Sequence, residues 1–396
     1  MLRVAKKIII NLFLASIAFP IVAQNEVETV LREIETNSTT LIALREQMEA
    51  QKLNNRTGIY LPNPEVEFNY LWGSPSPIGN RTDINITQSL DFPTAYGHRS
   101  RISKLENANA DIMYKSERIN LLLRAKQICV ELAYYNALAK EYTERLTNAG
   151  RIAETYRTRF DKGDANILEN NKAQLNLTAV GNEMDRIEIE RASLLSELRA
   201  LNGGVEIAFT TTNIVSEPLP ANFDDWYTIT EAKSPVLQYV KGQIEIGQQQ
   251  VSLNKALGLP KFIAGYMNEK VVGEKFQGVT IGVSVPLWEN KNKVKQAQAQ
   301  VRATEIALED NKIQFYGRLQ NLYKRSSGLQ ANALKYREAL SAYNNEVLLK
   351  KALDSGEISL LNYLLEIEYY YDAMNKVLEA ERDFGLSMAE LSAVEL

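Results

Sequence analysis

Long stretches of the chain repeat apolar side chains every three or four residues. Ile102, Leu105, Ala108 and Ile112 follow this spacing, which places them on one face of an α-helix. The helix predicted over residues 95–160 contains no proline. It would be about 100 Å long at ~1.5 Å per residue, whereas helices of globular proteins average about 11–12 residues. A helix of this length predicts a coiled coil or a helical bundle.

The second half of the chain carries the same order of predicted elements as the first. A helix over residues 291–353 matches the first long helix, and further helices are predicted over residues 165–201 and 359–391. An acidic turn with a glycine separates the two helices in each half. The turn residues are Asp161, Gly163 and Asp164 in the first half, and Asp354, Gly356 and Glu357 in the second. Glycine after one helix and before another predicts an antiparallel helical hairpin.

Segments of period two come before each long helix. Val66, Phe68 and Tyr70 alternate with Glu65 and Glu67, and one apolar face opposite one polar face is typical of a β-strand. Helices over residues 25–53 and 226–257 are predicted to precede the two strand pairs, and loops over residues 73–81 and 269–275 to join them. The four predicted strands cover about 64–72, 83–92, 261–268 and 277–287.

The order of elements indicates an internal duplication behind an export signal. Arg3, Lys6 and Lys7 precede an apolar run, and Ala23 offers a small residue for cleavage, as in a secretory signal peptide. The predicted organisation is a signal peptide (1–23), a first repeat (24–204), a linker (205–225) and a second repeat (226–396).

Composition excludes several classes of function. The formal net charge of −4 and the lack of a basic stripe argue against a nucleic-acid partner. The only cysteine is Cys129 and the only histidine is His98, so neither a disulfide framework nor a histidine-rich metal site can form. We interpret Cys129 as a packed small apolar residue and His98 as a junction residue. We expect a protein that is not an enzyme and that holds no metal or cofactor.

The strand pairs suggest how the chain meets a membrane. The polar face carries Glu65, Glu67, Asp83 and Asp91, which suits an aqueous lumen, and the apolar face suits lipid. Trp72, Tyr96 and Trp288 would form an aromatic girdle at the strand ends. An open sheet edge in lipid leaves backbone groups unpaired, so several chains must pool their strands. Closure alone permits a dimer or a trimer.

A soluble periplasmic helical scaffold is the alternative. In that case the strand pairs are ordinary hairpins, and a helix would have to cover the apolar row that begins at Val279.

Three phrases in the sequence resemble the TolC family of outer-membrane efflux proteins. They are Leu61-Pro62-Asn63-Pro64, Ser284-Val285-Pro286-Leu287 and Gly356-Glu357-Ile358-Ser359-Leu360-Leu361. The resemblance covers nearly the whole chain and includes the duplication. It implies a mainly α-helical protein with membrane β-strands, built from a duplicated helix–strand–strand–helix unit. Three chains would form a 12-stranded β-barrel on a long α-helical coiled-coil tunnel.

The same resemblance implies a location and partners. The protein would lie in the cell outer membrane and extend into the periplasm, as the passive exit duct of a tripartite efflux pump or a type I secretion system. Its partners would be a periplasmic adaptor and an inner-membrane RND or ABC transporter. The turn residues of both hairpins would dock the adaptor; the alternative is that their acids are merely solvated. A duct dedicated to metal cations is a further possibility, without methionine or histidine clusters to support it.

The family often places acids six and nine residues after the second turn glycine, where they form a selective ring. Here these positions hold Asn362 and Leu365. We therefore hypothesise that Asn362, Glu366 and Glu169 lie at a periplasmic constriction, with a solvated or interhelical role as the alternative.

Overall fold

The computed structural model describes residues 26–213 and 218–396. The predicted signal peptide, residues 1–23, lies outside the described residues.

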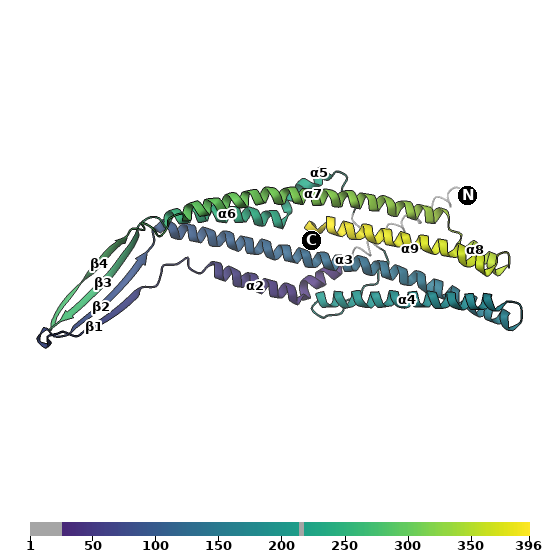
Figure 1. The fold of residues 1–396 in the computed structure, drawn as a ribbon, viewed down its shortest axis with the longest axis horizontal. Helices are drawn as coiled ribbons and strands as arrows, with labels where there is room; N and C mark the ends of the chain where they lie inside the picture. The colour runs from purple at the N-terminus through teal and green to yellow at the C-terminus, as the bar shows by residue number, and fades with distance from the viewer. Residues whose placement is uncertain (1–25, 214–217) are drawn as a thin grey trace, which may run out of the picture. The chain divides into compact units, whose positions relative to one another are not determined.

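All four predicted strands form, and they join into one antiparallel sheet in the order β1-β2-β3-β4 (Figure 1). A short 3-10 turn, Ser76–Ile78, lies in the loop between the first two strands. The strands are β1 (Glu65–Leu71), β2 (Arg81–Leu90), β3 (Lys261–Val271) and β4 (Glu274–Ser284). Strands from both halves of the sequence are therefore neighbours, because β2 pairs with β3 over ten residues.

The prediction of a loop over residues 269–275 is wrong. The strands continue to Val271 and restart at Glu274, so only Val272 and Gly273 form the turn. Both have positive φ, 47° and 88°, which suits the tight two-residue turns that continue the twist of a hairpin. The polar residues Glu269, Lys270 and Lys275 resemble a loop in the sequence but lie within the ladder.

The first half folds into the predicted helices. The long helix is α3 (Pro93–Asp161), with 69 residues, and α4 (Ile167–Leu201) follows the first glycine turn. The helix predicted over residues 25–53 is interrupted at Ser38, which separates a helix over residues 26–37 from α2 (Thr39–Asn55).

In the second half, two helices predicted as continuous are each divided. In place of the helix predicted over residues 226–257, the chain forms α5 (Phe223–Lys233) and α6 (Pro235–Ala256). The division falls here because Ser234 caps α6 and Pro235 can only begin a helix. Residues 291–353 form α7 (Lys293–Ala342) and α8 (Glu346–Asp354), with a break over residues 343–345. After the second glycine turn, α9 (Leu360–Leu391) runs as predicted, and a 3-10 turn (Ala393–Glu395) follows it.

The chain divides into two compact units. The sheet unit comprises Ala43–Ser116 and Glu231–Phe315, and the hairpin unit comprises residues 26–42, Glu117–Thr230 and Tyr316–Leu396. These units cut across the two sequence repeats, so the proposed duplication stays a prediction about sequence.

The hairpin unit holds most of the apolar core. One cluster joins the middle of α3 to the C-terminal part of α4, with Ile128, Cys129 and Leu198 fully buried. A second cluster joins α3, α4, α8 and α9 beside the glycine turns; its buried members are Ile152, Tyr156, Ala173, Leu353, Leu360, Tyr363 and Ile367. The two helical hairpins are therefore packed against each other where they turn.

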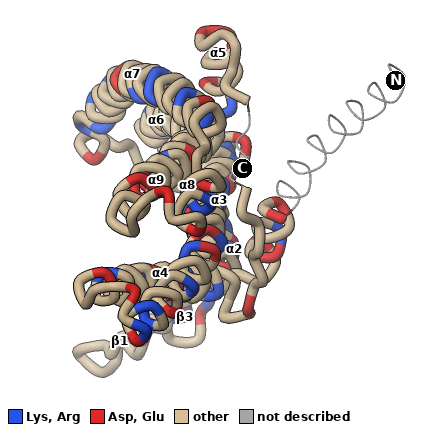
Figure 2. Tube along the Cα trace, turned by 90° about the vertical axis from the view of Figure 1, so that its right-hand side faces the viewer, with Lys and Arg blue, Asp and Glu red and all other residues tan. Residues whose placement is uncertain are grey.

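Close helix contacts support the sheet unit. Gly242 of α6 lies against Asn109 of α3, where a Cβ atom would come within 2.0 Å of the Asn109 Oδ1. Lys52 of α2 forms an ion pair with Asp111 of α3 at 2.6 Å. Figure 2 shows acidic and basic positions mixed along the helices rather than gathered into one basic stripe. Within the described ranges, no helix combines the length and the apolar character needed to cross a membrane.

Candidate functional site

The first hairpin turn is fixed by a left-handed glycine and a helix cap. Gly163 has φ +79°, a conformation that costs little only for glycine. The Asp164 N–H donates to the Arg159 carbonyl at 2.7 Å, which closes the end of α3. Asn166 then caps α4, because its Oδ1 accepts from the Glu169 N–H and the Glu169 Oε2 accepts from the Asn166 N–H, both at 3.0 Å.

The second turn repeats this geometry. Gly356 has φ +77°, and the Glu357 N–H donates to the Ala352 carbonyl at 2.9 Å. Ser359, three residues after the glycine as Asn166 is in the first turn, caps α9 by accepting from the Asn362 N–H at 3.2 Å. Two sequences with different residues therefore form the same glycine-and-cap turn.

The acids of the two turns differ in their surroundings. Arg151 of α3 forms an ion pair with Asp354 at 2.9 Å, which joins the first hairpin to the second. Asp161, Asp164 and Glu357 are exposed and form no ion pair within the described part of the chain. Because Asp161 is at the C-terminus of a helix, the helix dipole offers it no stabilisation. These three acids are therefore free to contact another molecule.

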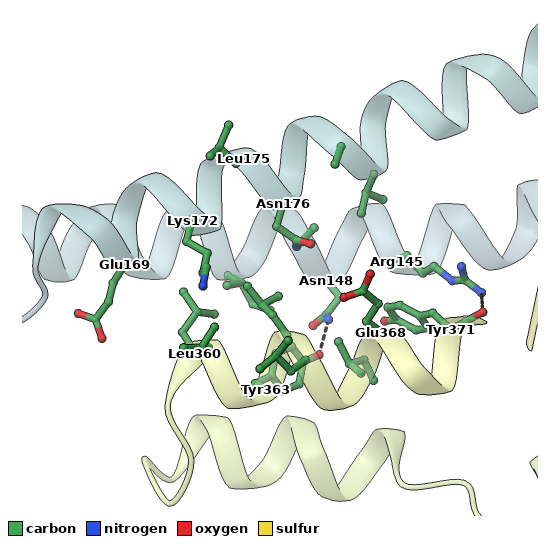
Figure 3. Close-up of a pocket in the computed structure, with 18 of the residues that line it drawn as sticks. Arg145, Asn148, Glu169, Lys172, Leu175, Asn176, Leu360, Tyr363, Glu368 and Tyr371 are labelled. Carbon is green, nitrogen blue, oxygen red and sulfur yellow. Dashed lines mark hydrogen bonds between the residues drawn. The ribbon is translucent and has the colours of Figure 1, made fainter. Parts of the chain in front are cut away.

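A groove of about 1090 Å³ lies between α3, α4 and α9 beside the turns (Figure 3). Lys172 of α4 and Glu368 of α9 extend into it, and Leu175 lies along its α4 side. On its floor, the Asn148 Nδ2 donates to the Tyr363 Oη at 2.8 Å. Burial raises the pKa of Tyr363, so its hydroxyl stays neutral.

A buried arginine lies at one end of the groove. Arg145 is only 4% exposed, and its guanidinium lies 4.5 Å from the Tyr142 ring centre and 4.2 Å from that of Tyr371. Nη2 donates to the Tyr371 carbonyl at 3.5 Å, whereas Nε has no hydrogen-bond partner in the described structure. Burial raises the pKa of Tyr371 and of the neighbouring Glu141. Burial therefore disfavours the charged form of both side chains at this end of the groove.

The residues proposed for the constriction are not all on the groove. Glu169 lines it and is held by its cap. Asn362 and Glu366 are exposed on α9 and are not among its lining residues. The groove instead takes its α9 acids from Glu368 and Asp372. Sequence reasoning missed the roles of Arg145, Tyr142 and Lys172, because nothing in the sequence showed which positions of α3 and α4 face α9.

The sheet presents two chemically distinct faces, because directly paired residues share a face. The pairing places the predicted apolar residues in common rows across the strands. One row is Val66, Ile86, Tyr266 and Val279; others bring together Phe68 with Ile84, Ala264 with Ile281, and Phe262 with Val283. Ile281 is 82% exposed, and Val279 81%. An uncovered apolar face of this size marks an interaction with lipid or protein.

The other face is polar, and some of its acids form ion pairs with arginines. Asp83 and Glu269 are direct partners across β2 and β3, and the Arg81 Nε lies 2.8 Å from one carboxylate and 3.1 Å from the other. Asp91, beyond the end of β2, is paired with Arg99 of α3 at 2.6 Å. Glu65 and Glu67 stay exposed. Acids therefore do line this face, but three of them already have cationic partners.

The aromatic residues predicted as a girdle lie in two kinds of place. Trp72, at the loop end of β1, and Trp288, beyond the end of β4, are largely exposed. Trp72 meets Tyr70 edge to face at 5.6 Å. Tyr96 is half-buried in α3, where its Oη accepts from the Asp91 N–H at 3.1 Å. The role of Tyr96 in a girdle stays a prediction. The structure shows instead that Tyr96 joins the end of β2 to the start of α3.

The remaining candidates for chemistry are structural. His98 Nδ1 lies 3.1 Å from the Gln249 Oε1, between α3 and α6. Cys129 is fully buried, and burial raises the pKa of its thiol to about 12. Among residues 26–213 and 218–396, no group of three or more His, Cys, Asp or Glu side chains is placed to hold a metal ion.

Solved structures with the same arrangement are outer-membrane proteins. The chain matches CusC, described in terms of folding and transmembrane channel formation, with a TM-score of 0.78 and 12% identity over 93% of this chain and 92% of that one. It matches the outer-membrane channel OprN with a TM-score of 0.76 and 11% identity, over 93% and 89% of the two chains. VceC, an outer membrane protein of Vibrio cholerae, gives 0.73 and 15%, over 93% and 96%.

The protein has the fold of the TolC-family outer-membrane channels. In sequence, the chain is similar to the alkaline protease secretion protein AprF of Pseudomonas aeruginosa. It is 22% identical over 309 residues, which are 71% of this chain and 62% of AprF. The chain thus spans less than two thirds of the length of that relative. No family model matches the chain.

Proposed function

We propose that the protein is the outer-membrane exit duct of an efflux pump or a type I secretion system. The observation that carries this proposal is the exposed apolar face of a four-stranded sheet on a chain with the TolC-type fold. Its polar face would line the aqueous path, and the helices would continue that path into the periplasm. The duct would be passive, with no reaction of its own and no cofactor.

Closure of the sheet supports a homotrimer. β1 and β4 are the outer strands: among the described residues β1 pairs only with β2 and β4 only with β3, so each has one unpaired edge. In lipid, each unpaired backbone group costs several kcal/mol, so these edges must meet edges of other copies. Three chains would supply twelve strands, enough to surround a water-filled path. Two chains would also remove the edges; the resemblance of the sequence to the TolC family favours three.

The partners follow from the two turns. We propose that the tips Asp161–Asp164 and Asp354–Glu357 dock a periplasmic adaptor, which joins the duct to an inner-membrane RND or ABC transporter. The exposed Asp161, Asp164 and Glu357 support this. AprF is a secretion protein for an alkaline protease, and that favours an exported protein as cargo over a small drug or a metal cation. Glu169 would face the narrowest part of the path.

Cell fractionation followed by the mass of the detergent-extracted protein, corrected for bound detergent, tests the duct itself. We expect the protein in the outer-membrane fraction with three chains per particle. A detergent-free monomer in the periplasmic fraction would contradict the duct and support the helical scaffold. Two chains per particle would contradict the trimer only.

Charge reversal tests the adaptor contact. Asp164→Lys combined with Glu357→Lys is expected to weaken transport severalfold in cells, because both side chains are exposed and form no ion pair among the described residues. Glu117→Lys with Asp185→Lys, at exposed positions of α3 and α4 that form no ion pair among the described residues, changes the net charge equally and serves as the control. Equal transport by both double variants would remove the turns from the docking surface.

A further inference from the structure

Two lysines lie directly opposite each other at the loop end of the sheet. Lys270 of β3 and Lys275 of β4 are paired one step inside the Val271–Glu274 pair that closes the turn. In a two-residue hairpin this is a non-hydrogen-bonded pair, whose Cα atoms are about 4.5 Å apart and whose side chains are close. Both lysines are exposed. The pairing therefore places the two lysine side chains next to each other on one face of the sheet.

These lysines are the only charged side chains that the four strands place on the apolar face. Their row also contains Tyr70 of β1 and Thr82 of β2. Every acid of the strands lies on the opposite face, and neither lysine forms an ion pair within the described residues. Like charges directly opposite each other destabilise a sheet. The row therefore has an excess of positive charge that an anion would relieve.

The height of the row fits a particular level of a membrane. Phe262 marks the start of the apolar face, and Lys270 lies eight residues further along β3. At ~3.3 Å per residue this is about 26 Å along the strand. A strand tilt of about 40° reduces it to a height of about 20 Å, near the top of the ~25 Å apolar band of membrane strands. The row lies at the sheet end away from α3 and α6 of the same unit (Figure 1). Trp72, two residues after Tyr70, lies at this end.

We propose that Lys270 and Lys275 bind a phosphate group of an outer-leaflet lipid, a site that rests on the proposed outer-membrane function. The two ammonium groups reach different oxygens of one phosphate, and the hydroxyls of Tyr70 and Thr82 complete the row. The Asn80 Nδ2 already donates to the Tyr70 Oη at 2.6 Å, which leaves the tyrosine proton available for the anion. The lipid chains then lie on the apolar rows below.

Retention of a phosphorylated lipid by the purified full chain tests the site. The detergent-extracted protein is mixed with diphosphorylated lipid A, and the lipid bound per particle is measured by native mass spectrometry. Lys270→Gln with Lys275→Gln is expected to lower the apparent affinity about tenfold or more. Lys270→Arg with Lys275→Arg is expected to retain binding. Lys291→Gln with Lys293→Gln removes the same charge away from the face and serves as the control.

Each outcome bears on a separate claim. Equal binding by the Gln pair and the wild type would overturn the site, whereas the particle mass and the membrane fraction would still report on the duct. Equal binding of lipid A without its phosphates would exclude the phosphate contact. Full competition by millimolar inorganic phosphate would replace the lipid by a free anion and overturn the proposal. Failure of the wild type to reach the outer membrane would contradict the duct itself.

Discussion

The guanidinium of Arg145 is held between the rings of Tyr142 and Tyr371 at the inner end of the groove. A desolvated cation over an aromatic face contributes about 2 kcal/mol or more, and the arginine stem adds apolar packing. One arginine thus connects the two hairpins, since Tyr371 is on α9 and Arg145 on α3. Its buried Nε has no hydrogen-bond partner among the described residues, which offsets part of this stabilisation.

We expect Arg145→Ala to lower the free energy of unfolding by about 1–2 kcal/mol. Arg157→Ala, an exposed residue of the same helix, should change it by less than about 0.5 kcal/mol. Chemical denaturation of the purified protein compares the two. Equal losses would show that the tyrosine stack contributes nothing.

Cys129 provides a test of burial by pH. Because burial raises its pKa to about 12, the thiol stays protonated at neutral pH and forms thiolate only as the pH approaches that value. We expect no labelling by iodoacetamide at pH 8 in the folded protein, and full labelling in denaturant. Ser196→Cys combined with Cys129→Ala should be labelled at once, because Ser196 is exposed. Rapid labelling of native Cys129 would contradict the packing of α3.

At the scale of elements, a glycine within α3 and a glycine in the turn after it have opposite requirements. Gly163 ends the helix with positive φ, whereas Gly150 is helical and a Cβ added there would meet nothing within 4 Å. We expect Gly163→Ala to destabilise the turn by about 1–2 kcal/mol, and Gly150→Ala to stabilise the helix by about 0.5–1 kcal/mol. Hydrogen exchange of the amides around Asp161 should become faster in the first variant and slower in the second. Changes of the same sign would contradict the turn geometry.

The sequence was sufficient for elements with a strong period or an unmistakable stop. Gly163 and Gly356 marked both hairpins, and alternation located the strands. The division before Pro235 was visible in principle, because a proline after serine starts a helix. The break over residues 343–345 has no glycine or proline, and its local signal is the pair Asn344 and Asn345, because asparagine favours helix caps. The groove was beyond prediction, because it depends on which faces of α3, α4 and α9 meet.

At the scale of the whole molecule, the two faces of the sheet predict opposite responses to charge. Ile281→Arg places a cation on the exposed apolar face, at a cost of about 2–4 kcal/mol if that face meets the middle of a bilayer. Thr280→Arg, one residue earlier on β4, places the same cation on the polar face and should be tolerated. The amount of each variant in the outer-membrane fraction measures the difference. Equal amounts would show that lipid does not cover the apolar face.

The break between α7 and α8 gives the two hairpins different mechanics. The first arm is one continuous rod of 69 residues, so deflecting its tip requires bending hydrogen-bonded turns along its length. The second arm has a joint over residues 343–345, where rotation of a few backbone dihedrals swings the short lever α8 together with its turn. An equal force on both tips therefore meets a continuous helix in the first hairpin. In the second hairpin it can be accommodated by rotation at the break between α7 and α8. Displacement at this end of the chain will concentrate in the second hairpin.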